Sequence, residues 1–100
     1  MTKNHRNELT IIQTPIAELT AWTGNARKHS KKQLQQIADS ISEFGFTNPV
    51  LIDEDQNILA GHGRVAAAQM LGLEKVPCAV LDHMTDAQKR AYVLADNKLA

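Results

Sequence analysis

The chain has almost no cysteine, no excess charge of either sign and no long apolar run, and each absence excludes a class of protein. Its single cysteine, Cys78, permits no internal disulfide and is typical of a reducing compartment, which predicts a cytoplasmic protein. No apolar stretch approaches the roughly 18 residues of a membrane-spanning helix. The histidines share no metal-ligand spacing, so we expect no metal site. They are His5, His29, His62 and His83.

The balance of charge also limits the possible partners. Eleven basic and 11 acidic residues give a formal net charge of zero, so any contact with DNA would need a local basic patch. One hundred residues suffice for one domain with a modest core. We expect a disordered segment over 1–8 and a domain over 9–95, with a linker or helix over 96–100 that continues into a missing C-terminal region.

What the sequence does contain is an alternation of short strands and helices. The order predicts an α+β domain, with three helices packed around a small mixed sheet that includes a β-hairpin. The expected elements are a strand over 9–13, a helix over 30–45, a β-hairpin over 50–60, a helix over 62–71, a strand over 76–81 and a helix from 85 onward.

Several element ends have recognisable capping residues. Ser30 is expected to cap the first helix, and Gly45 to end it in the left-handed conformation. Thr85 and Gln88 stand in capping-box positions before the last helix. Pro77 favours an edge or first-residue position for its strand, because proline cannot donate to a sheet. The last helix runs through Ala87, Ala91, Leu94 and Ala95.

The segment over 59–72 is the most informative, because a strand, a glycine turn and an alanine-rich helix follow one another directly. Gly61 and Gly63 permit a positive φ or close approach of a ligand. The first amides of the helix have no helical partner, and Arg64 can donate a planar pair of bonds to phosphate oxygens. The alternative is that the glycines only turn the chain and Arg64 caps a carbonyl or carboxylate. His62 can contact phosphate, act as a general base or cap the helix.

A second basic cluster lies at the start of the first long helix. Its residues either form a solvated surface or contact a nucleic-acid backbone. Asn25 can fix the preceding loop by bonding its own backbone, and Asn48-Pro49 forms a further turn. These loops and the glycine turn would form one cleft if the hairpin packs beside both helices. The basic residues are Arg27, Lys28, His29, Lys31 and Lys32.

Several of these segments, taken in order, resemble the N-terminal domain of ParB-type partition proteins, which shares its fold with sulfiredoxin. The resemblance covers roughly residues 9–95. It implies that the glycine–arginine turn and the earlier arginine loop bind nucleotide phosphates, and it assigns the contacts to Gly61, Gly63, Arg64 and Arg27, with His62 and Asn25 beside them. The segments are Asn25-Ala26-Arg27-Lys28, Ser40-Ile41-Ser42-Glu43-Phe44-Gly45, Asn48-Pro49-Val50, Gly61-His62-Gly63-Arg64, and Leu71-Gly72 before Val76-Pro77.

The departures from the family pattern restrict the function. Partition proteins typically have a glutamate and two arginines after the first glycine and a further arginine two residues on, whereas here Arg64 is the only arginine that remains. A CTP-driven clamp is therefore not expected. Sulfiredoxin has its reactive cysteine where this chain has His62, and Cys78 lies in an apolar strand, so sulfiredoxin chemistry is not expected either.

The Gly-His-Gly-Arg turn and the last helix look most like ParB-like domains fused to phage and bacterial DNA-modification methyltransferases. The leading hypothesis is a nucleotide- or phosphate-binding module of a DNA-modification or DNA-partitioning protein, with ATP or CTP and Mg²⁺ as ligands. Its partners would be a nucleotide, DNA and the C-terminal domain of the same protein. If the ligand is hydrolysed, His62, Asp53 or Glu54 would position water.

Two other functions stay open. The first is a DNA-binding or nuclease module that uses the basic patch of Arg27, Lys28, Lys31 and Lys32. The second is a small-molecule kinase, because relatives with a Gly-His-His-Arg turn phosphorylate free serine. No methyltransferase motif is present in the chain.

Overall fold

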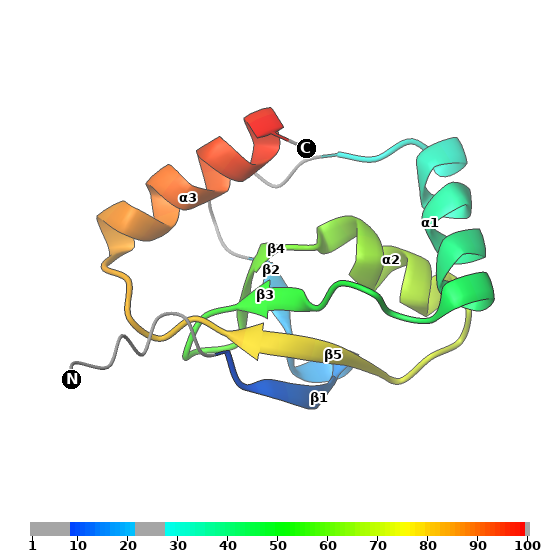
Figure 1. The fold of residues 1–100 in the computed structure, drawn as a ribbon, viewed down its shortest axis with the longest axis horizontal. Helices are drawn as coiled ribbons and strands as arrows, with labels where there is room; N and C mark the ends of the chain where they lie inside the picture. Colours follow the sequence, from blue (N-terminus) through cyan, green and yellow to red (C-terminus); the bar gives the residue numbers. More distant parts are fainter. Residues whose placement is uncertain (1–8, 22–27, 100) are drawn as a thin grey trace.

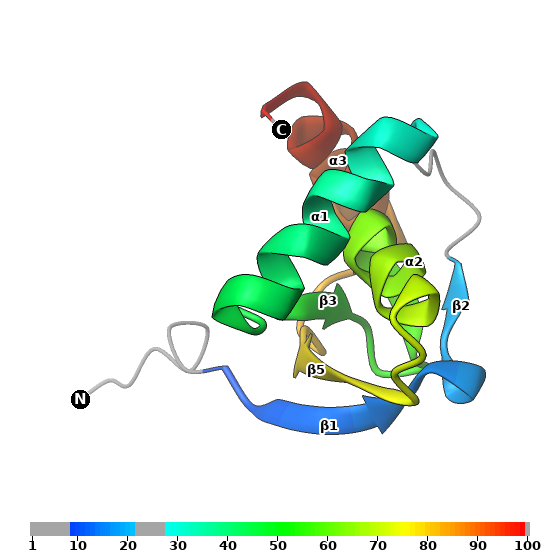
Figure 2. The ribbon, with the colours of Figure 1, turned by 90° about the vertical axis from the view of Figure 1, so that its right-hand side faces the viewer.

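Five strands form one mixed sheet, and the three α-helices lie on one side of it (Figures 1 and 2). The computed structural model describes residues 9–21 and 28–99. Within them, the α+β class and the expected order of elements are confirmed. The elements are β1 (Ile11–Pro15), a 3-10 turn η2 (Ile16–Glu18), β2 (Thr20–Ala21), α1 (Lys31–Phe44), β3 (Val50–Ile52), β4 (Asn57–Ala60), α2 (His62–Met70), β5 (Lys75–Val80) and α3 (Asp86–Leu99).

The sheet has the order β1-β5-β3-β4-β2. The predicted hairpin is present, with β3 antiparallel to β4, and β5 runs parallel to β3 and antiparallel to β1. The two-residue strand β2, which the sequence did not predict, pairs with β4 in parallel. This topology places the end of β4 and the start of α2 between β3 and the β2 edge, where α3 packs on β4 and α1 packs on α2.

The expectation that Pro77 marks an edge strand or the first residue of its strand is wrong, because β5 is an inner strand and begins at Lys75. Strand β5 lies between β1 and β3. The pairing of β5 with β3 begins at Cys78, however, so at Pro77 the strand has a neighbour on only one side. The missing N–H therefore falls where β5 is still locally an edge.

The helix starts follow the predicted capping chemistry. The Ser30 hydroxyl accepts from the Gln33 amide at 3.1 Å, and the Gln33 side chain accepts from the Ser30 amide at 2.9 Å. Thr85 and Gln88 make the same reciprocal pair before α3. Gly45 has the expected positive φ of 78°, but its ψ of −172° lies outside the left-handed helical region. The capping residues were thus predictable, whereas the exit angle of α1 was not.

Two apolar clusters hold the helices against the sheet. The larger cluster lies under α2 and consists of Val50, Ile52, Ile58, Val65, Ala68, Val76 and Cys78. The smaller cluster, Leu59, Leu81 and Val93, holds α3. Helix α3 buries Lys89 and Val93, and Ala87, Ala91, Leu94 and Ala95 are exposed. The alanine pattern therefore predicted the helix but not the face that it buries.

No helix in the described part of the chain is long and apolar enough to cross a bilayer.

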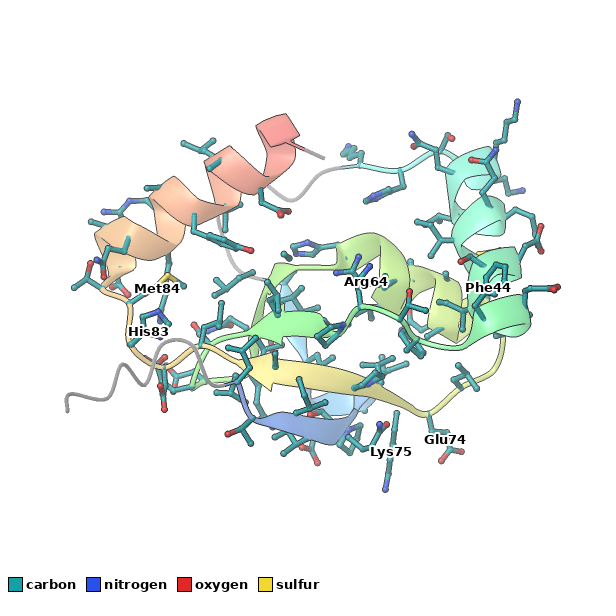
Figure 3. The ribbon with its side chains drawn as sticks, in the orientation of Figure 1. Phe44, Arg64, Glu74, Lys75, His83 and Met84 are labelled. Atoms are coloured by element: carbon teal, nitrogen blue, oxygen red, sulfur yellow. The ribbon has the colours of Figure 1, made fainter. Side chains whose placement is uncertain are left out.

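Phe44 at the end of α1, labelled in Figure 3, is 71% exposed although it continues the apolar stripe of that helix.

Candidate phosphate-binding site

The turn between β4 and α2 requires glycine for two reasons. Gly61 adopts a left-handed conformation with φ 103° and ψ 20°, which residues other than glycine rarely adopt. A Cβ at this position would also lie 3.2 Å from the Cα of Val50. The tight turn lets α2 begin directly after a buried strand.

The first turn of α2 presents backbone donors that have no backbone acceptor among the described residues. The first helical hydrogen bond runs from the Val65 amide to the Gly61 carbonyl at 3.0 Å, so the amides of His62, Gly63 and Arg64 precede the helical pattern. Gly61 has no side chain to cap them. Free amides at the positive end of a helix dipole favour an anion.

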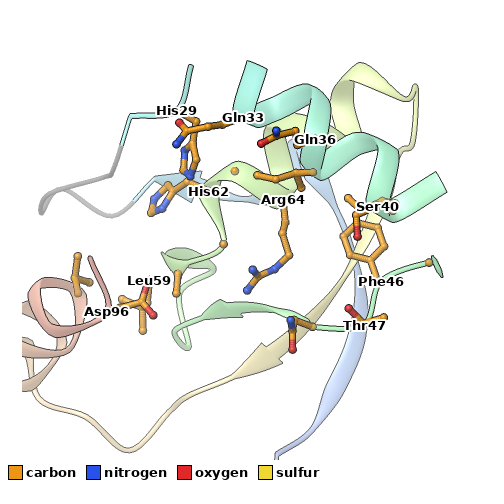
Figure 4. A pocket seen from close by; sticks show the side chains of 18 residues that line it. His29, Gln33, Gln36, Ser40, Phe46, Thr47, Leu59, His62, Arg64 and Asp96 are labelled. Atoms are coloured by element: carbon orange, nitrogen blue, oxygen red, sulfur yellow. The ribbon is translucent and has the colours of Figure 1, made fainter. Parts of the chain in front are cut away.

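These residues line a pocket of about 480 Å³, which is within the size range of small-molecule sites (Figure 4). Asn48 lies in the same pocket, so the expected convergence of its turn with the glycine turn is confirmed. Asn25 and Arg27 lie outside the described residues, and their part in the cleft stays a prediction. The pocket is lined by His29, Gln33, Gln36, Ile37, Ser40 and Ile41, then Gly45, Phe46, Thr47 and Asn48, then Leu59 to Arg64, and by Val93 and Asp96 of α3.

Arg64 reaches from α2 into the middle of this pocket (Figure 4). Its Nη2 donates to the Pro49 carbonyl at 3.0 Å, whereas its buried Nε has no partner among the described residues. Burial lowers the pKa of the guanidinium, and the charges of Asp96 and Tyr92 partly oppose this effect. Within the described part of the chain, the ion pairs involve Lys89 and not Arg64. Arg64 therefore bonds to a neutral carbonyl, and no carboxylate of the described residues lies within ion-pair distance of it, although the charge of Asp96 acts on it from α3.

His62 and His29 lie next to each other at the start of α2 (Figure 4). Burial lowers the pKa of His62, repulsion from His29 lowers it further, and the charge of Asp96 partly raises it. The His62 Nε2 is buried and has no partner among the described residues. The imidazole in the first turn of α2 is therefore neutral at physiological pH in the free protein.

Several pocket residues were not singled out by the sequence. His29 belongs to the predicted basic cluster only, and Gln33 is the capping-box partner of Ser30. Gln36 and Asp96 carry no local signal, because each occupies an ordinary polar position of a helix. Lys28, Lys31 and Lys32 are exposed and do not line the pocket. A role for these lysines in nucleic-acid binding thus stays a prediction that is separate from the pocket.

The idea that Asp53 or Glu54 positions water in this site is wrong, because neither residue lines the pocket. Asp53 is 1% exposed, accepts from the amides of Asp55 and Asn57, and pairs with the Lys89 ammonium at 3.0 Å. Burial raises the pKa of Asp53, but these bonds together hold it below its ordinary value. Asp53 therefore stabilises the hairpin turn and attaches α3 to it.

Cys78 has the inert surroundings that its apolar strand indicated. Its side chain is fully buried between β1 and β3, and burial raises the pKa of the thiol. A protonated, enclosed thiol is a poor nucleophile.

Comparison with known proteins gives consistent relatives. A family model described as the ParB N-terminal domain matches residues 1–98. The chain is 52% identical over 83 residues to the ParB-like nuclease domain-containing protein YnaK of Escherichia coli (strain K12), covering 83% of this chain and 95% of YnaK. It is 32% identical over 91 residues to the chromosome-partitioning protein Spo0J of Thermus thermophilus, covering 87% of this chain. The match spans 34% of that Spo0J, so this chain corresponds to about a third of it.

Solved structures share the fold. ParB of Caulobacter crescentus, C-terminally truncated and complexed with CTP-γ-S, superposes with a TM-score of 0.75 at 26% identity over 91% of this chain and 54% of its own. A free serine kinase in complex with AMP gives 0.59 at 26% identity, covering 78% of this chain and 32% of the kinase. Sulfiredoxin of Arabidopsis thaliana gives 0.67 at 23% identity, covering 84% of this chain and 97% of its own, a likeness of fold alone.

Proposed function

Because the chain belongs to the family of ParB N-terminal domains, we propose that it is a nucleotide-binding module that holds a phosphate at the first turn of α2. One observation carries the proposal. Uncapped amides and the Arg64 guanidinium, which has no carboxylate partner among the described residues, lie together at an open pocket. Amides at a helix N-terminus and a guanidinium both stabilise phosphate oxygens.

Each residue of the turn has a distinct part in this proposal. Gly61 and Gly63 let the ligand approach the backbone closely, and Arg64 donates its remaining N–H groups to phosphate oxygens. His62 lies beside the same oxygens. Asn25 and Arg27 complete the site if the family pattern holds for the loop before α1.

The ligand proposed is a nucleoside triphosphate, ATP or CTP. Support comes from the CTP-γ-S of the Caulobacter ParB and the AMP of the free serine kinase. The described residues hold no cluster of three side chains suited to a metal ion, so Mg²⁺ would enter on the phosphates rather than in a protein cage. Since charge-assisted bonds contribute about 1.5–3 kcal/mol each, a turn with one arginine should hold a triphosphate less tightly than a turn with three.

We also propose that this module belongs to a larger protein that acts on DNA, either a DNA-modification methyltransferase or a partitioning protein. The support is the family itself, which includes the partitioning protein Spo0J. In such a protein, this module would report nucleotide binding to the C-terminal domain.

Calorimetric titration of the protein with ATP, CTP and ADP, with and without Mg²⁺, tests the proposal. We expect saturable binding that Arg64→Ala abolishes or greatly weakens. Arg90→Ala is the matched control, because Arg90 is exposed on α3 and does not line the pocket. Absence of binding to every nucleotide would overturn the proposal.

DNA binding is the second candidate, and the exposure of Lys28, Lys31 and Lys32 around the start of α1 favours it. Binding to duplex DNA would then weaken with salt at a slope near −0.9 per phosphate neutralised. Replacing the three lysines by glutamine should reduce this slope, whereas Arg64→Ala should leave it unchanged. The opposite pattern would assign any DNA contact to the pocket.

Phosphate transfer is an extension of the proposal and depends on His62, because His62 lines the pocket and Asp53 does not. Release of inorganic phosphate from ATP or CTP, or transfer of phosphate to free serine, would establish it. Either activity must be lost in His62→Ala.

A further inference from the structure

Two imidazoles meet at the first turn of α2, although they come from different elements. His62 is the first residue of α2, and His29 directly precedes Ser30, the cap of α1. Both line the pocket (Figure 4). The packing of α1 against α2 therefore brings the two rings together.

Gly63 provides the space for this arrangement. A Cβ at Gly63 would lie 2.9 Å from the Nε2 of His29 and 3.0 Å from the Cδ1 of Ile37. The His29 ring thus rests directly against the first turn of the helix, beside the amides that we assign to the phosphate. Because Gly63 has no side chain, the His29 ring can approach the first turn of α2, and any side chain at this position would obstruct it.

Two nitrogens at this place lack partners. Among the described residues, nothing bonds to the buried His62 Nε2 or to the Arg64 Nε. Buried polar nitrogens are usually bonded, so an orphaned pair beside free amides indicates that a ligand or solvent completes the site.

The charges that face His62 come from three elements. Burial is the largest cause that disfavours a positive charge on His62, and His29 before α1 and the dipole of α2 act in the same direction. Asp96 of α3 is the opposing charge, and Tyr92 of the same helix is neutral with a raised pKa. Without a ligand, this balance disfavours protonation of the His62 ring.

We propose that His62, against which His29 lies, takes up one proton from solvent when a phosphate-bearing ligand binds, so that affinity rises as pH falls. A phosphate at the free amides would place two or more negative charges beside His62 and reverse the balance that opposes its protonation. Both ring nitrogens of His62 then donate. His62 supplies, under control of pH, part of the positive charge that arginines would supply permanently. This inference rests on the proposed nucleotide binding.

The sign of the effect follows from linkage. A ligand that raises the pKa of a group is itself bound more tightly by the protonated form. The gain develops as pH falls through the pKa of His62 in the complex, and it is complete below the pKa of free His62, which lies below its ordinary value. For one proton, affinity changes by at most about tenfold per pH unit.

Calorimetry with ATP between about pH 6 and pH 8, in buffers of different ionisation enthalpy, measures the protons taken up directly. We expect net proton uptake of up to one proton in the native protein and a large loss of uptake in His62→Gln. Comparing variants with one ligand removes the protonation of ATP itself from the difference. His83→Gln is the matched control, since His83 is exposed and lies in the segment before α3, away from Arg64 (Figure 3).

Imidazole titration by NMR gives a second readout that needs no ligand. His29→Gln should raise the pKa of His62 in the free protein, because it removes the repulsive neighbour. Equal proton uptake in the native protein and His62→Gln would overturn the inference and leave nucleotide binding intact. Absence of binding at every pH would overturn both.

Discussion

Two cations in the described part of the chain are withdrawn from solvent, and their surroundings are opposite. Lys89 of α3 is 4% exposed and contacts Asp53 at 3.0 Å and Glu54 at 3.4 Å. Arg64 of α2 is half-buried, and its bonded partner among the described residues is the neutral Pro49 carbonyl. The first charge is neutralised within the fold, whereas the second faces a pocket. A cation without a carboxylate partner beside free amides is therefore the better indicator of a binding site.

The largest expected effect comes from breaking the ion pair between Lys89 and Asp53. Lys89→Met retains the apolar stem but leaves the Asp53 carboxylate buried without its cation. Removing one partner of a buried ion pair costs about 3–5 kcal/mol. Urea unfolding should show this loss of stability, and Arg90→Ala should change stability by less than about 0.5 kcal/mol. An unchanged midpoint for Lys89→Met would mean that the pair is structurally neutral.

Arg64→Ala, in contrast, should weaken nucleotide binding more than it destabilises the fold. We expect nucleotide affinity to fall by about 1.5–3 kcal/mol, because a charge-assisted contact is lost. The free energy of unfolding should fall by only about 1 kcal/mol, since one hydrogen bond to a neutral carbonyl disappears. Arg64→Lys, which keeps the charge without the planar fork, should recover part of the affinity. A loss of stability as large as that for Lys89→Met would contradict the contrast.

A change at Gly61 sharpens the comparison by disturbing the turn that places Arg64. Gly61→Ala should cost about 1–2 kcal/mol for the left-handed backbone alone, and its Cβ would lie 3.2 Å from Val50 Cα and 3.4 Å from Arg64 Nη2. Gly72→Ala is the matched control, because Gly72 has φ 76° and nothing within 4 Å of its Cβ. Thermal unfolding of both variants should show the greater loss at Gly61, and nucleotide affinity should fall only there.

The smallest expected effect is a loss of folding stability at acidic pH. The pKa of Asp53 is lowered in the folded protein, so its contribution is complete above its unfolded pKa and is lost as pH falls through the folded value. Stability should therefore decline below about pH 4, with part of the decline traceable to this carboxylate. Comparing urea midpoints of the native protein and Asp53→Asn through this range isolates the contribution. Parallel curves for the two proteins would show that Asp53 contributes no acid sensitivity.

Local chemistry made much of the fold predictable. The caps at Ser30 and Thr85, the hairpin and the Gly61 turn depend on residues within a few positions of one another. The burial of Lys89 was not predictable, because its partner Asp53 lies 36 positions away. The internal place of β5 and the two-residue strand β2 likewise depend on pairings distant in sequence.

The candidate site divides in the same way. Gly61, His62, Gly63 and Arg64 form one continuous segment, so their spacing alone indicated an anion site. His29 and Asp96 reach the pocket only through the packing of α1 and α3, and neither belongs to a motif. Sequence can therefore predict the turn that would bind phosphate, but not the residues that surround it.

The single thiol of the chain gives these comparisons a built-in reporter. Cys78 is fully buried on the inner strand β5, so a maleimide or disulfide reagent can reach it only when the domain opens. Its labelling rate should therefore rise in Lys89→Met and fall when a nucleotide saturates the pocket, because ligands that bind only the folded state reduce opening. The labelling rate of this native cysteine would thus report both the stability of the domain and the occupancy of the pocket by nucleotide.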